Sequence, residues 1–81
     1  MLIRSQNKKV ICNFGPGCAI EMLGENDEGK HLIYMSCGQD DYDLGFYSTE
    51  DEAMGVAEDI ACAATYEYGL YDMPEAAEEP A

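Results

Sequence analysis

The stretch YSTEDEAMGVAEDIACAATYEYG, residues 47–69, decides the fold class because its hydrophobic period changes from two residues to about 3.6. Thr49 and Glu52 match the T-x-x-E capping box, in which a hydroxyl and a carboxylate satisfy free backbone N–H groups at a helix start. We therefore expect a helix from about residue 50 to about residue 68. Gly69 suits the left-handed position just past the helix end.

Short β-type runs separated by Gly, Asn and Asp precede this helix. They span residues 2–5, 10–14, 18–23, 31–37 and 42–47. Alternation puts Leu44 and Phe46 on one face of the fifth run. Proline at position 74 keeps the residue before it extended, which favours a short edge segment after the helix.

These patterns predict an α+β fold in which a small antiparallel sheet of about five strands is packed by one C-terminal helix, with a short extended segment after it. A chain of 81 residues has room for one modest core. We expect residues 1–74 to form a single compact domain and residues 75–81 to form an acidic flexible tail.

The net charge of −13 is distributed very unevenly. Charges cancel over residues 1–30, whereas residues 31–81 hold thirteen acids and neither Lys nor Arg. Nucleic acids and anionic membranes would repel such a chain, so we expect no direct contact with either. A basic protein surface or a cation would be attracted.

Targeting signals and cysteine usage point to the cytoplasm. The N-terminal residues MLIRSQNKKV lack the pattern of a signal peptide, and no apolar run is long enough to span a membrane. In that reducing compartment we expect the cysteines to stay thiols. They are Cys12, Cys18, Cys37 and Cys62.

The segment ICNFGPGCAI, residues 11–20, sets two cysteines around Gly-Pro-Gly, which is typical of a turn between strands. Structural zinc sites use closer pairs such as C-x2-C, and Cys37 and Cys62 stand apart. A calcium loop starting at Asp41 would have Phe46 where the sharp turn requires glycine. We expect no metal and no cofactor.

A catalytic constellation is not visible either. His31 is the only histidine, and Cys37 on the same strand would lie about 20 Å away. Another strand could bring Cys12 or Cys18 closer, although a lone His at a strand start is usually structural. We assign no catalytic residue and expect the protein not to be an enzyme.

Tyrosines lie beside many of the acids, and tyrosine is enriched at protein interfaces. Half of these rings could equally cover the edges of a small core. Two segments, DDYDLGFY and TYEYGLYD, combine acids with tyrosines and are predicted to form surfaces suited to a basic partner. The candidate site is assigned to the first of them and to the helix start. Its candidate residues are Asp40, Asp41, Tyr42, Asp43, Tyr47, Glu50, Asp51 and Glu52.

Three segments, MLIRSQNKK at the start, LGFYSTEDEA before the helix and YDMPE after it, resemble a group of small uncharacterised proteins of Gram-positive bacteria, their phages and mobile elements. The group has no established activity, so no functional residue transfers. The resemblance implies a cytosolic, strand-rich domain with a late helix and favours a mobile-element context.

Two functions remain open. The first is an interaction module that binds a basic protein, such as one that handles nucleic acid, by imitating the charge of the nucleic acid. The second is a structural accessory protein that forms a homodimer or larger oligomer through an edge strand or the alanine-rich helix face, with no catalytic activity.

Overall fold

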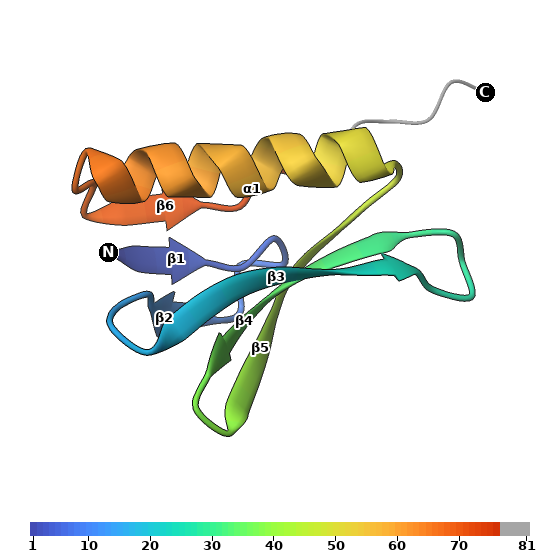
Figure 1. The fold of residues 1–81 in the computed structure, drawn as a ribbon. Coiled ribbons are helices and arrows are strands. Elements are labelled where there is room, and N and C mark those ends of the chain that lie inside the picture. The colour runs from blue at the N-terminus through green and yellow to red at the C-terminus, as the bar shows by residue number, and fades with distance from the viewer. Residues whose placement is uncertain (77–81) are drawn as a thin grey trace.

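The computed structural model describes residues 1–76, which fold into six strands and one helix (Figure 1). The elements are β1 (Leu2–Arg4), β2 (Ile11–Asn13), β3 (Cys18–Glu25), β4 (His31–Cys37), β5 (Asp40–Tyr47), α1 (Glu50–Thr65) and β6 (Leu70–Asp72). Of the predicted acidic tail, residues 77–81 lie outside the described residues. Within the described part, no helix is long and apolar enough to cross a membrane.

The strands form two sheets of three strands each, with the orders β2-β1-β6 and β3-β4-β5. The α+β class is confirmed, whereas the expected single sheet of about five strands is wrong. The short extended segment expected after the helix is present as β6, so the helix is not the C-terminal element. β6 pairs in parallel with β1, which the sequence did not predict. The chain passes from one sheet to the other through Gly15-Pro16-Gly17, where Gly17 has a φ of +86°.

Helix α1 begins as its capping signal predicts. The Thr49 hydroxyl accepts a hydrogen bond from the Glu52 N–H at 3.1 Å, and the Glu52 carboxylate accepts one from the Ser48 N–H at 3.2 Å. The helix ends at Thr65, earlier than expected. Glu67, not Gly69, adopts the left-handed conformation after it, with a φ of 57°. The helix therefore ends earlier in the chain than Gly69 predicts.

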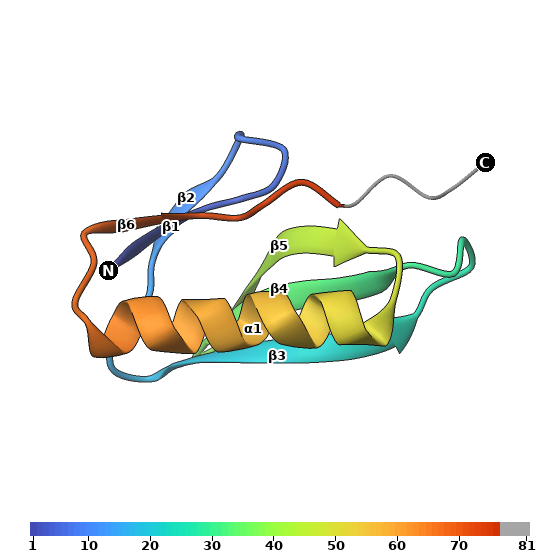
Figure 2. The same ribbon diagram turned by 90° about the horizontal axis from the view of Figure 1, so that it is seen from above.

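The core lies between the helix, the small β2-β1-β6 sheet and one face of the β3-β4-β5 sheet (Figures 1 and 2). Figure 2 shows α1 running along the β3-β4-β5 sheet, with β1 and β6 beside it. Four helix residues are buried there at helical spacing, namely Ala53, Val56, Ile60 and Ala63. Ala53 and Ala63 are small and let the helix lie close to the sheet, while Ile60 is one of the largest side chains of the core.

A register shift in the β4–β5 pairing changes which side chains of β5 face the core. Ile33 pairs with Gly45, whereas the next residue of β4 pairs with Asp43, so Leu44 is the extra residue of a bulge. Leu44 is therefore buried while Phe46 is 40% exposed. The expectation that these two side chains share a face is wrong, because a bulge shifts the alternation by one residue.

Candidate interaction face

The face of the β3-β4-β5 sheet that points away from the core carries three rows of cross-strand neighbours. The first row is Leu23, Leu32 and Phe46; the second is Glu21, Tyr34 and Asp43; the third is Ala19, Ser36 and Asp41. We call these nine residues the outer face. One end of it is apolar and the other is acidic.

The apolar end of the outer face is open to solvent. Leu23 is 55% exposed and Phe46 is 40% exposed, and they flank the half-buried Leu32. Large apolar side chains that lie together at a surface are typical of contact sites. The apolar row therefore offers a partner a surface that loses water on contact.

The acidic end is organised around Tyr34. Partial desolvation, the charge and hydrogen bond of Glu21 and the charge of Asp41 all raise the pKa of Tyr34. The phenol donates to the Glu21 carboxylate, an arrangement that favours the protonated form of Tyr34. In cross-strand register, neighbouring strands lie about 4.8 Å apart, so Glu21 and Asp43 are about 10 Å apart across Tyr34. The three carboxylates place negative charge on one side of the sheet.

The structure divides the eight residues predicted for partner binding among several places. Asp41 and Asp43 lie on the outer face, whereas Asp40 and Tyr42 alternate to the other side of β5. Tyr42 is 37% exposed and lines a hollow beside Cys12. Neighbours in sequence are thus separated onto two faces of one strand.

Tyr47 is not available to a partner. Its side chain is fully buried, and its hydroxyl donates a hydrogen bond to the Pro74 carbonyl oxygen at 2.8 Å. The prediction that Tyr47 anchors a partner is therefore wrong. A tyrosine at this spacing fills the core because the bulge returns the strand to an inward position at residue 47.

The remaining three predicted residues lie at the start of α1, at the far end of β5 from Asp40. Glu50 and Asp51 are exposed, and the half-buried Glu52 takes part in the helix cap. These acids stabilise the helix start, where the dipole favours negative charge. Along β5, Asp43 lies four residues before the end of the strand, a distance of about 13 Å, so the acids of the helix start do not join the outer face.

Sequence reasoning missed the contributions of β3 and β4 to the outer face. Glu21 and Leu23 belong to one strand, and Tyr34 belongs to the next. Alternation alone puts each of them on a definite face of its strand. The missing information was the strand register, which brings them beside Asp43 and Phe46.

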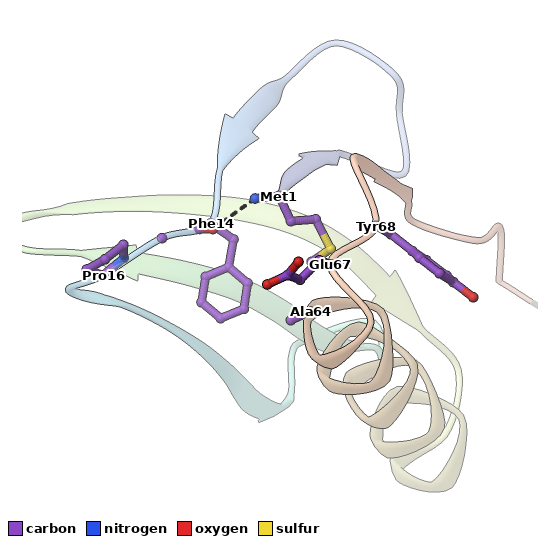
Figure 3. A pocket seen from close by; sticks show the side chains of 7 residues that line it. Met1, Phe14, Pro16, Ala64, Glu67 and Tyr68 are labelled. Carbon is purple, nitrogen blue, oxygen red and sulfur yellow. Dashed lines mark hydrogen bonds between the residues drawn. The ribbon is translucent and has the colours of Figure 1, made fainter.

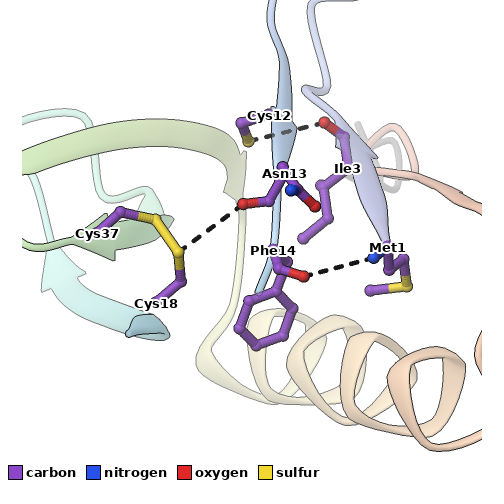
Figure 4. The surroundings of a disulfide bond; sticks show 7 residues. All are labelled: Met1, Ile3, Cys12, Asn13, Phe14, Cys18 and Cys37. Atoms are coloured by element: carbon purple, nitrogen blue, oxygen red, sulfur yellow. Dashed lines mark hydrogen bonds between the residues drawn. A yellow bond between two sulfur atoms is a disulfide. The ribbon is translucent and has the colours of Figure 1, made fainter. Parts of the chain in front are cut away.

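The cysteines differ from expectation. Cys18 and Cys37 form a disulfide, with Cα atoms 4.2 Å apart, because the β3–β4 register places them directly opposite each other (Figure 4). The expectation of four thiols is wrong for this pair. Cys12 and Cys62 are free thiols. Burial raises the pKa of Cys12, whose thiol donates to the Ile3 carbonyl oxygen at 3.7 Å.

No cysteine lines the hollow that His31 shares with residues of β3 and α1. The nearest acidic partner of His31 is Glu25, with Nε2 3.9 Å from Oε1. Over residues 1–76, no three His, Cys, Asp or Glu side chains gather in a way that could hold a metal ion.

Comparison with protein-family profiles, with curated proteins and with solved structures finds no match to this chain.

Proposed function

We propose that this chain is a protein-interaction module that binds a basic protein through the outer face. The observation that carries the proposal is the convergence of Glu21, Asp41 and Asp43 beside the exposed Leu23 and Phe46. The partner would present lysine or arginine side chains next to apolar ones. A protein that handles nucleic acid has such a surface, and the net charge of −13 would compete with its natural ligand.

The two ends of the outer face would contribute differently to binding. Exposed carboxylates steer a basic partner and raise the association rate, an effect that salt screens over about 10 Å at 0.1 M ionic strength. The apolar row loses water on contact and therefore slows dissociation. Binding should weaken with salt without disappearing.

The test compares partner capture by three immobilised proteins. The first is the natural chain. The second carries Glu21→Gln, Asp41→Asn and Asp43→Asn. The third carries Glu58→Gln, Asp59→Asn and Glu75→Gln, which remove the same charge from exposed positions elsewhere.

Bacterial lysate is passed over each protein, and elution uses rising salt or duplex DNA. We expect a nucleic-acid-binding protein on the natural chain and on the control variant, released by both eluents and lost from the outer-face variant. Equal loss from both variants would show that bulk charge, not this face, holds the partner. Retention of nothing specific would overturn the proposal in that host.

A homo-oligomeric accessory role is the second candidate. It is favoured by β3, which lies at the edge of its sheet and, within residues 1–76, pairs only with β4. Antiparallel pairing of β3 strands from two copies of the chain would bring their two Glu21 side chains close together. This pairing would be weakened, because like charges opposite each other are destabilising. Sedimentation separates the roles. A stable dimer that β3 variants dissociate would favour the accessory role.

We further propose a cytoplasmic location and a mobile-element context, as the resemblance implies. The Cys18–Cys37 disulfide gives the proposed location a direct test, because disulfides persist mainly in oxidising compartments. If the chain is cytoplasmic, the bond seen in the structure would form only after the protein leaves the reducing compartment. Rapid alkylation of cells that produce the protein, followed by mass spectrometry, should then find Cys18 and Cys37 as free thiols. A fully bonded pair would contradict the cytoplasmic location.

A further inference from the structure

A hollow of about 350 Å³ lies at the C-terminal end of α1, away from the outer face (Figure 3). Its walls come from Met1, from Phe14 directly after β2, from the first residues of the Gly-Pro-Gly turn, and from the end of α1 with the two residues Glu67 and Tyr68 that follow it. Phe14 points its ring toward the helix end near Ala64, while the Tyr68 ring extends away from Phe14 (Figure 3). The volume suits a small organic group.

Charges of both signs border this hollow. The N-terminal ammonium of Met1 donates a hydrogen bond to the Phe14 carbonyl oxygen at 3.4 Å (Figure 3). The Glu67 carboxylate points into the space beside the Phe14 ring (Figure 3). The negative end of the helix dipole lies at the same place, and the last turn of α1 has no basic residue. Among residues 1–76 no cationic side chain pairs with Glu67. A cation placed here would meet a carboxylate, a dipole and the face of an aromatic ring.

A glutamate at position 67 lowers the stability of the fold in two ways. Its φ of 57° belongs to the left-handed region, where glycine is favoured, and the residue follows directly on the helix cap. An anion at the C-terminal end of a helix is also disfavoured by the dipole. Backbone conformations of this kind cluster at functional sites. A ligand that needs the carboxylate would account for a Glu at this position.

We propose that this hollow binds an alkylammonium group. The ammonium would lie against the Glu67 carboxylate, and the carbon chain would pack on Phe14 and Ala64. Two sources share this chemistry, a free small amine and the lysine side chain of a protein segment. The site is separate from the outer face, so it does not depend on the proposed function.

The first experiment follows amide and methyl NMR signals of the full chain while n-butylammonium chloride is added. Sodium chloride at equal ionic strength is the salt control, and n-butanol is the neutral ligand of similar shape. We expect saturable, millimolar binding of n-butylammonium that moves the signals of Phe14, Ala64 and Glu67. Equal affinity for n-butanol would overturn the proposal, and so would the absence of saturable shifts.

The second experiment repeats the titration with variants of matched charge. Glu67→Gln should weaken n-butylammonium binding by about fivefold or more, because it removes the charged acceptor. Glu58→Gln removes one charge from an exposed position in α1 and should change binding less than about twofold. An unchanged affinity in Glu67→Gln, or equal losses in both variants, would contradict the site.

A third titration identifies the source of the ligand. N-acetyl-lysine N-methylamide carries the ammonium as a protein segment would. Tighter binding of this probe than of n-butylammonium supports a site for a lysine side chain, and the reverse order supports a site for a free amine. If neither probe moves the signals of Phe14 and Ala64, no alkylammonium site exists here.

Discussion

The hydroxyl of Tyr47, at the end of β5, donates a 2.8 Å hydrogen bond to the carbonyl oxygen of Pro74, in the segment that follows β6. The same oxygen accepts a 3.3 Å hydrogen bond from the Gln6 side chain, whose amide also binds both backbone groups of Phe46. Side chains therefore tie the two sheets together where no strand pairing joins them.

Replacing Tyr47 with phenylalanine should lower the free energy of unfolding by about 1 kcal/mol, because a largely buried hydrogen bond is lost while the ring stays packed. Urea unfolding followed by circular dichroism measures the change. Tyr42→Phe is the matched control, since Tyr42 is partly exposed, and should change stability by less than about 0.5 kcal/mol. Equal effects would mean that the Pro74 contact contributes nothing.

Stability should fall at alkaline pH. Burial, followed by the charges of Tyr71 and Glu52, raises the pKa of Tyr47 far above its ordinary value of about 10. Above pH 10 the unfolded chain loses this proton while the folded chain keeps it. Deprotonation therefore stabilises the unfolded state and lowers the free energy of unfolding. The contribution is complete below about pH 10 and shrinks as the pH rises beyond it.

Unfolding curves of the natural chain and Tyr47→Phe, recorded between pH 8 and pH 11.5, test this dependence. Tyr34 and Tyr71 also have raised pKa values, so the variant should lose part of the alkaline slope and keep the rest. The stability difference between the two proteins should narrow above pH 10. A constant difference would show that Tyr47 ionises equally in both states.

The sequence alone predicted the features that depend on interactions between residues close together in the chain. The capping box at Thr49 and the helical hydrophobic period after it follow from spacing alone, and the structure confirms both. The two sheets were missed because strand partners are set by tertiary contacts. Nothing in the sequence of residues 70–72 predicts parallel pairing with β1. A three-residue strand carries too little pattern to specify its partner.

The candidate site was predicted only in part for the same reason. Asp41 and Asp43 were recognised from composition, and both lie on the outer face. Tyr47 was misplaced because one bulge residue, Leu44, shifts the alternation along β5. Cys18 and Cys37 could not be paired without the register, since neither forms a close pair in sequence. The errors at Tyr47 and in the outer face trace to register, whereas the expectation of thiols rested on the reducing compartment assigned to the chain.

Loss of the Cys18–Cys37 disulfide should destabilise the fold by about 3 kcal/mol, because a cross-link over a sequence separation of 19 restricts the unfolded chain. The double variant Cys18→Ser, Cys37→Ser should show this loss in urea unfolding, as should the reduced natural chain. Cys62→Ser removes an exposed free thiol and should have little effect. If reduction leaves the unfolding midpoint unchanged, the bond does not support the native state.

Replacing Glu67 with glycine should make the protein more stable while removing the proposed alkylammonium site. Glycine accepts the φ of 57° without the steric cost of a side chain, and the change also removes an anion from the negative end of α1. Together these should raise the free energy of unfolding by about 1 kcal/mol. Urea unfolding gives this value, and the n-butylammonium titration should lose its saturable shifts.

Glu67→Gln separates the two causes of the expected gain. This variant removes the charge but keeps a side chain at the left-handed position. It should therefore raise the free energy of unfolding only by the electrostatic contribution, a few tenths of a kcal/mol. A glycine variant that is less stable than the natural chain would mean that the Glu67 side chain makes a stabilising contact within the fold. The carboxylate would then be placed for the protein's own stability, and the argument from its cost for a ligand would fail.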